Sequence, residues 1–238
     1  MKILAIDTSS SICTVCICED ENVLIELNNS DEKTHSQKLM PMIQDAFDKT
    51  NLNLDDIDLL ASSLGPGSFT GVRIGISTIK AFSDVKKLPT VGVSSLEGLA
   101  YNLNTNGLIC SIIDAKNENV YYGLFEFKDS KCNNIIILST DNINNLINYL
   151  NNLQTSNSEI SFVGDGAILY KELLVKVLSN RYKEMHFTLD DKNNASSISI
   201  AKSALVKFKN GEYGNSNTLI PLYLRKSQAE RALEEKNG

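Results

Sequence analysis

Three short apolar runs open the chain, and each has the length and composition of a β-strand: residues 2–6, 12–18 and 22–27. From Leu39 to Phe47 the apolar side chains then recur three and four residues apart, which predicts an amphipathic helix over about 35–49. Alternating apolar runs and helical spacings continue to about residue 103, so the first half is predicted to be β-β-β-α-β-α-β-α. The later elements are strands at 57–64 and 90–93 and helices at 72–85 and 95–103.

A second series of elements begins near Leu108. The apolar run 108–114 ends in an acid, and the run 120–127 is rich in aromatic β-formers. The asparagine-rich segment 133–158 carries a stripe of isoleucine and leucine that predicts a short surface helix. The remaining predicted elements are a strand at 160–163 and helices at 167–179 and 196–209. We therefore expect an α/β protein with an N-terminal domain at 1–106, a smaller domain at 107–220 and a tail at 221–238.

Four glycines and a proline fall within Gly65–Gly75, the string GPGSFTGVRIG, between a predicted strand and a predicted helix. Glycines at such a junction permit a positive φ and a close approach by another backbone or by a ligand. The string is not a P-loop, because Val72-Arg73 follows Gly71 where Lys and Ser or Thr would stand. It is not a dinucleotide-binding fingerprint either, because Gly71 falls one residue late and the junction is far from the first strand. On spacing alone, a tight turn with a closely packed helix is the simplest interpretation.

Composition limits the function. The 238 residues are 42% hydrophobic and 22% charged, which suits one large or two small globular domains. The N-terminal run is too short for a signal peptide and no run is long enough to span a membrane, so we expect a cytoplasmic protein. The net charge of −6 argues against a chain that grips nucleic acid by itself, because phosphate contacts require basic surface. If the protein acts on tRNA, a partner must supply most of the positive charge.

Metal and disulfide chemistry are weakly supported. Five cysteines is an odd number, and Cys13, Cys16 and Cys18 lie on a predicted strand that places the first on one face and the other two on the opposite face. No second cysteine pair or histidine pair completes a zinc site, and H-E-x-x-H is absent. We expect buried thiols, no metal, and His35 as a helix-start residue.

Two acids follow equivalent strands. Asp7-Thr8-Ser9 comes after the first strand of the first half, and Asp114-Ala115-Lys116 comes after the first strand of the second half. Acids and serines are common in turns, so each tripeptide alone is weak evidence of a site. Their equivalent positions suggest a duplicated fold.

The string GPGSFTGVRIG, the segment HSQKLMP at 35–41 and the closing P-L-Y-L-R at 221–225 together resemble the bacterial TsaB (YeaZ) family, which takes part in making threonylcarbamoyladenosine on tRNA. The resemblance implies two RNase H-like domains of the actin, Hsp70 and sugar-kinase type, with mixed sheets flanked by helices. Asp7, Thr8, Ser9 and Asp114 would then be vestiges of the phosphate loops that hold Mg²⁺ and phosphate in active superfamily members. The family pattern D-A-R-x-x-E-V-Y is altered here, since Lys116 and Asn119 replace Arg and Glu.

The resemblance also implies a role without catalysis. The chain would be a scaffold or activator for TsaD, the subunit that transfers threonylcarbamoyl to N6 of adenosine 37 in tRNAs reading codons that begin with A. The ATPase TsaE would dock on the pair, tRNA would bind mainly through the complex, and the isolated chain would form a homodimer. No cofactor would be required by this chain, and the resemblance leaves room for ATP or ADP and Mg²⁺ in the complex. Two helices of the first domain would form the partner interface through His35, Leu39, Met42, Ile43, Phe69, Val72, Arg73, Ile76 and Ile79.

The alternative is an enzyme that acts on its own. A nucleotide-dependent ATPase or kinase of the same superfamily would use Asp7 and Asp114 with Mg²⁺ to position phosphate. Nucleotide hydrolysis by the isolated chain, and its loss on replacing Asp7, would distinguish this alternative from the scaffold.

Overall fold

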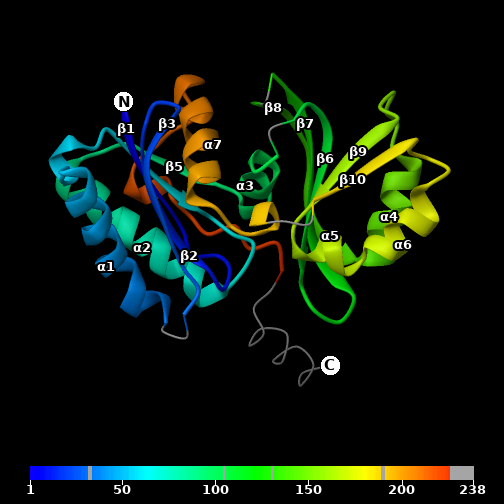
Figure 1. The fold of residues 1–238 in the computed structure, drawn as a ribbon, viewed down its shortest axis with the longest axis horizontal. Helices are drawn as coiled ribbons and strands as arrows, with labels where there is room; N and C mark the ends of the chain where they lie inside the picture. The colour runs from blue at the N-terminus through cyan, green and yellow to red at the C-terminus, as the bar shows by residue number, and fades with distance from the viewer. Residues whose placement is uncertain (32–33, 104, 130, 189–190, 226–238) are drawn as a thin grey trace.

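Two five-stranded mixed sheets stand side by side, each with helices packed against it (Figure 1). The computed structural model describes residues 1–225 except 32–33, 104, 130 and 189–190. Residues 226–238, most of the predicted tail, lie outside the described residues. None of the described helices is both long and apolar enough to cross a membrane.

The first sheet has the strand order β3-β2-β1-β4-β5. The strands β1, β2 and β3 pair antiparallel, whereas β4 and β5 add parallel to β1. Crossover helices make such parallel additions possible. The strands are β1 (Lys2–Asp7), β2 (Cys13–Glu19), β3 (Asn22–Asn29), β4 (Leu59–Ser63) and β5 (Thr90–Val93).

The second sheet repeats this topology strand for strand, in the order β8-β7-β6-β9-β10 when counted from the antiparallel edge. Again three strands are antiparallel and two are parallel. The duplicated α/β fold predicted from the sequence is thereby confirmed. The strands are β6 (Gly107–Asp114), β7 (Asn119–Lys128), β8 (Lys131–Asn142), β9 (Glu159–Val163) and β10 (Glu184–Phe187).

Helices α1 (His35–Thr50) and α2 (Phe69–Lys86) cover one face of the first sheet. As expected, Thr34 and Gln37 begin α1: the Thr34 amide donates to Gln37 Oε1 at 3.2 Å. Helix α2 starts three residues earlier than predicted, because the Ser68 hydroxyl accepts a hydrogen bond from the Gly71 amide at 3.1 Å and so caps the first turn.

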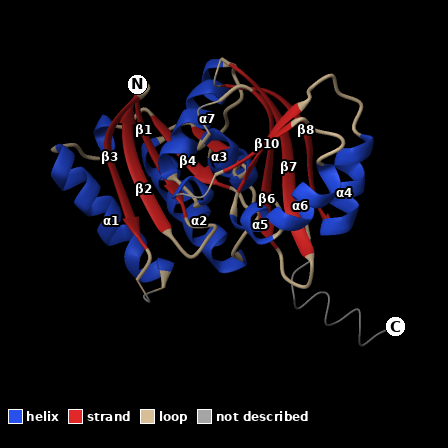
Figure 2. Ribbon diagram, turned by 45° about the vertical axis from the view of Figure 1, so that its right-hand side comes forward, coloured by secondary structure: helices blue, strands red, loops and turns tan. Residues whose placement is uncertain are grey.

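The last helix of each half packs on the sheet of the other half. Helix α3 (Ser95–Tyr101) covers the second sheet through Leu96 and Leu99, and α7 (Ser197–Lys209) covers the first sheet through Ile200 and Ala204 (Figures 1 and 2). By their order along the chain, residues 196–209 were expected to belong to the second domain. The domain boundaries remain a prediction, but the packing of α7 is with the first sheet.

Two strands, β8 and β10, were not predicted from the sequence. Strand β8 lies at the sheet edge and begins with Lys, Cys and two Asn, which a partly exposed edge tolerates although β-propensity disfavours Asn. Strand β10 has only four residues. The predicted helix 167–179 is two helices, α5 (Asp165–Leu169) and α6 (Lys171–Leu178), which meet at Tyr170. With α4 (Ile143–Asn152), which was predicted, α6 covers one face of the second sheet.

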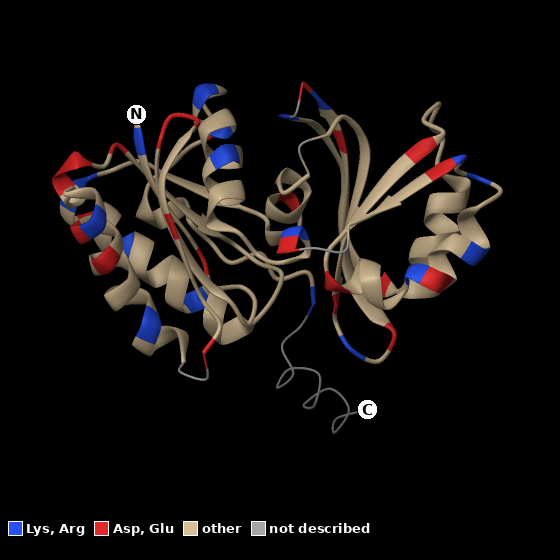
Figure 3. Cartoon of the chain, in the orientation of Figure 1, with Lys and Arg blue, Asp and Glu red and all other residues tan. Residues whose placement is uncertain are grey.

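The cysteines lie where strand alternation places them. Cys13 belongs to the core beneath α1 and α2, and Cys16 and Cys18 belong to the core beneath α7. All five cysteines are free, as their odd number suggested. Charges of both signs are interspersed over the helices and loops of both halves (Figure 3).

Candidate functional site

The turn after β1 is held by the carboxylate of Asp7. This side chain is buried, and its Oδ1 accepts hydrogen bonds from the Ser9 amide at 2.8 Å and from the Ser63 hydroxyl at 2.7 Å. Burial raises the pKa of Asp7, and the hydrogen bonds from Ser63 and Ser9 oppose that shift. The carboxyl group therefore stabilises the turn itself by accepting hydrogen bonds from Ser9 and Ser63.

The glycine junction closes over this turn. The Ser68 amide donates to the Ser9 carbonyl at 2.7 Å, and the Thr8 hydroxyl donates to the Gly71 carbonyl at 2.7 Å. A Cβ on Gly67 would lie 2.2 Å from the Ser9 oxygen, and one on Gly71 would lie 2.0 Å from the Thr8 oxygen. These glycines are required because two backbones touch, which is the close approach predicted for the junction.

His35 ties the start of α1 to the same turn. Its Nε2 lies 2.7 Å from the Ser10 carbonyl oxygen, so this nitrogen carries the proton in the tautomer that donates. Its Nδ1 is buried and finds no hydrogen-bond partner among the described residues. The prediction that His35 is a helix-start residue agrees with its place as the first residue of α1.

The second acid turn is more open. Asp114 accepts from the Lys116 amide at 2.9 Å and from the Lys116 ammonium group at 2.7 Å. The latter hydrogen bond raises the pKa of Lys116. Asp165, at the glycine turn after β9, accepts from the amides of Asp114 at 3.0 Å and Gly166 at 2.7 Å. Asp165 thus stabilises the second acid turn through hydrogen bonds, as Ser63 stabilises the turn after β1.

A cleft of about 690 Å³ lies between the two turns. It brings together Asp7, Ser9 and Asp114, which the sequence had grouped as vestigial phosphate loops, whereas Thr8 is turned into the junction. Sequence reasoning did not single out Ser95, whose buried hydroxyl lines the cleft and has no partner among the described residues. No pattern in the sequence could have found it, because only the packing of α3 brings it to the cleft.

The predicted partner-interface residues divide by environment. Six apolar members are buried in the core between α1, α2 and the first sheet, where they position the two helices, and their contact with a partner stays a prediction. The predicted apolar stripes of α1 and α2 are present, and they pack on the first sheet because this packing removes the most apolar surface from water. These six are Leu39, Met42, Ile43, Val72, Ile76 and Ile79.

Phe69 and Arg73 contact the C-terminal segment instead. Tyr223 stacks on Phe69 with ring centroids 5.1 Å apart, and its hydroxyl accepts from Arg73 Nε at 2.8 Å. The Leu222 amide donates to the Leu64 carbonyl at 2.8 Å, and the Arg225 guanidinium donates to the Ala115 carbonyl at 3.2 Å. Residues 221–225 therefore form a strap, a segment that runs from the glycine junction to the second acid turn. From its charges alone the sequence analysis expected a solvated end.

The comparisons with known proteins agree with the motifs. A family model described as "TsaD: tRNA N6-adenosine threonylcarbamoyltransferase" matches residues 23–233. The tRNA threonylcarbamoyladenosine biosynthesis protein TsaB of Bacillus subtilis is 30% identical over 97% of this chain and 96% of its own length. The chain belongs to the TsaB/YeaZ family.

Solved structures place this TsaB-family chain in its fold class. YeaZ from Pseudomonas aeruginosa superposes with a TM-score of 0.75 at 23% identity, covering 94% of this chain and 99% of that one. The ROK hexokinase from Thermus thermophilus superposes with a TM-score of 0.52 at 9% identity, covering 89% and 100%. The second likeness concerns the fold alone and confirms the sugar-kinase type of architecture.

Proposed function

We propose that this chain is a non-catalytic scaffold and activator within the machinery that makes threonylcarbamoyladenosine on tRNA, and that it binds the transferase subunit TsaD. The observation that carries the proposal is the closed first turn of the cleft. Asp7 is engaged by Ser9 and Ser63, and the polar groups of Thr8 and Ser9 are engaged by the glycine junction. The groups that would hold phosphate in an active superfamily member are thus committed to the fold.

The residues fit a magnesium nucleotide poorly. Mg²⁺ in nucleotide sites is usually held by one or two ionised carboxylates, and burial favours the neutral form of Asp7. Asp114 is already paired with Lys116. We therefore propose that this chain requires no cofactor, and that any ATP, ADP or Mg²⁺ of the complex is held elsewhere.

The partner surface is proposed to be the α1–α2 outer face, defined here as the exposed residues Met40, Gln44, Arg73, Ser77 and Ala81. These lie opposite the buried stripes, and Met40, which is 50% exposed, gives this face a large apolar side chain. The same face would serve a homodimer of the isolated chain. The ATPase TsaE would dock on the pair. Binding of tRNA would occur mainly through the complex, because this chain carries a net charge of −6.

The test is size-exclusion chromatography with light scattering on the chain alone and mixed with TsaD from the same organism. A new one-to-one species at the expense of the free chain is expected. Absence of any complex, with or without ATP, would contradict the proposal. Ser77→Arg and Ala81→Arg on the outer face should weaken the complex, and Lys49→Glu, on the exposed end of α1, is the matched charge-changing control.

The second candidate is an ATPase or kinase of the same superfamily, favoured by the cleft of about 690 Å³ that places Asp7 and Asp114 on one cavity. ATP hydrolysis by the purified chain alone, abolished by Asp7→Asn and Asp114→Asn, would support it. Hydrolysis that appears only with TsaD or TsaE present would not.

A further inference from the structure

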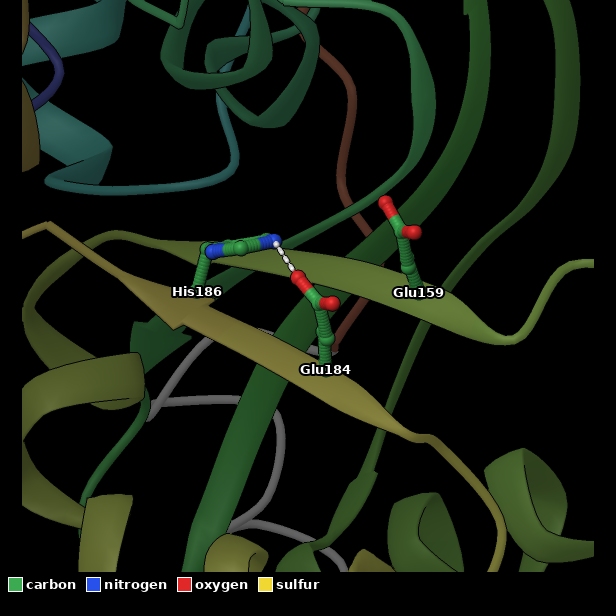
Figure 4. A group of neighbouring side chains, drawn as sticks. All are labelled: Glu159, Glu184 and His186. Atoms are coloured by element: carbon green, nitrogen blue, oxygen red, sulfur yellow. Dashed lines mark ion pairs between the residues drawn. The ribbon is translucent and has the colours of Figure 1, made fainter.

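Strands β9 and β10 place three metal-binding side chains on one side of the second sheet (Figure 4). In their parallel pairing Glu184 lies directly beside Glu159, and His186 lies beside Ser161. Residues two apart on a strand share a face, so Glu184 and His186 project together. Met185 and Ile160 alternate with these residues along the two strands and pack into the core with α4 and α6. The side chains on the opposite face of β9 and β10 therefore point toward solvent.

The arrangement is electrostatically unfavourable without a counter-charge. Two exposed carboxylates lie at paired positions on neighbouring parallel strands, and like charges so placed repel each other. Within the described part of the chain, the one basic group within 4.0 Å of either carboxylate is His186, whose Nε2 lies 3.7 Å from Glu184 Oε2. A bound cation would relieve this repulsion.

We propose that Glu159, Glu184 and His186 form a surface site for a divalent transition-metal ion of the zinc type. One potential ligand atom from each residue lies within 4.8 Å of the others. Ligands of a tetrahedral zinc ion, at about 2.0–2.2 Å from the metal, are about 3.3–3.6 Å from one another. Because all three side chains are exposed, small rotations close this gap without disturbing the packed core.

The ligand set selects the class of metal. An imidazole nitrogen favours zinc and its neighbours over Ca²⁺ and Mg²⁺, which prefer oxygen ligands alone. Three protein ligands leave a fourth position for water. Glu159 and His186 also line a hollow of about 310 Å³, together with Ser158 and Ser161.

The experiment is calorimetric titration of the full, tag-free chain with ZnCl₂, repeated with CoCl₂ while the visible spectrum is recorded. One zinc ion per chain is expected, with the affinity falling by at least about tenfold in His186→Ala and in Glu159→Gln. Imidazole nuclear magnetic resonances give a second readout. The chain has two histidines, and zinc should shift the signal that disappears in His186→Ala while leaving that of His35 in place.

Two variants control for adventitious binding. Glu172→Gln removes an exposed carboxylate on α6, and Cys132→Ser removes the one thiol that is not fully buried. Both should bind zinc as the unaltered chain does. Either the absence of zinc binding, or binding that His186→Ala leaves unchanged, would overturn the proposal.

Discussion

The ring of Tyr223 lies almost parallel to that of Phe69, with an interplanar angle of 12°, and the Arg73 guanidinium sits 5.6 Å from the centre of the Tyr223 ring. This contact joins the C-terminal strap to the first turn of α2. The strap then reaches the second acid turn through Arg225. The two halves of the cleft are therefore linked by five residues at the end of the described chain.

Removing the Tyr223 ring should loosen the strap. Tyr223→Ala loses a stacked pair and a hydrogen bond to Arg73, so the free energy of unfolding should fall by about 1–2 kcal/mol. Tyr223→Phe keeps the stack and should lose about 0.5–1 kcal/mol. Urea unfolding measures both, and limited proteolysis should cut the alanine variant first within the strap. Equal stability of all three proteins would show that the strap is only loosely attached.

Gly71 should tolerate no side chain. Its Cβ would meet the Thr8 carbonyl oxygen at 2.0 Å, and the backbone on both sides is held by hydrogen bonds, so Gly71→Ala should cost about 3 kcal/mol or more. Gly107→Ala is the matched control. Gly107 has a φ of +95° but nothing within 4 Å of its Cβ, so the cost there should be about 1 kcal/mol, from the backbone alone. Thermal unfolding of the two variants provides the comparison, and similar costs would argue against the close contact.

The exposed and buried sides of α2 should respond differently to charge. Ile76 is 3% exposed, so Ile76→Asp should lower stability by about 3–5 kcal/mol and prevent folding rather than report on a partner. Ser77→Arg, one residue later on the outer face, should leave the circular dichroism spectrum and melting temperature unchanged. It should nevertheless weaken TsaD binding at least tenfold. Normal binding by Ser77→Arg would exclude this face as the interface.

Asp7 should make the folded state less stable as the pH rises. Burial raises the pKa of this carboxyl above its ordinary value of 3.8, so the folded protein holds the proton more tightly than the unfolded chain does. The contribution of Asp7 to stability therefore declines once the pH passes about 4 and continues to decline up to the raised pKa.

Asp7→Asn removes this titration and keeps an Oδ1 acceptor for Ser9 and Ser63. The stability of the variant relative to the unaltered protein should increase from pH 4 to pH 7, as measured by urea unfolding at each pH. TsaD binding at pH 7 should be unchanged. A stability difference that does not vary with pH would mean that folding does not shift the pKa of Asp7.

Glu97 and Lys207 should be strongly coupled. The carboxylate of Glu97 on α3 is buried, accepts from the Ser203 hydroxyl at 2.7 Å and pairs with Lys207 on α7 at 3.2 Å. Lys207→Met leaves that carboxylate buried without its counter-charge and should lower the free energy of unfolding by about 3 kcal/mol. Adding Glu97→Gln should recover much of the loss. A double-mutant cycle in urea measures the coupling, and additive effects would show that the pair is independent.

Much of the secondary structure follows from the sequence because local patterns determine it. Strand alternation assigns Cys13 and Cys16 to opposite faces, and the capping residues Thr34 and Gln37 locate the start of α1. The edge strand β8 was missed because its polar residues remove the alternation that buried strands show. The short strand β10 was missed because four residues carry too little periodicity.

The sequence by itself determined the α/β class, the order of elements in the first half, the glycine junction and the family, because these depend on spacing along the chain and on residues close together in it. Only the tertiary structure decided which side of α1 and α2 is buried, since an apolar stripe looks the same whether it faces a sheet or a partner. It also decided that α7 covers the first sheet, that Tyr223 reaches Phe69, and that His186 lies beside Glu184 and Glu159. Such contacts join residues that are distant in sequence, and their energies are set by packing rather than by local propensity.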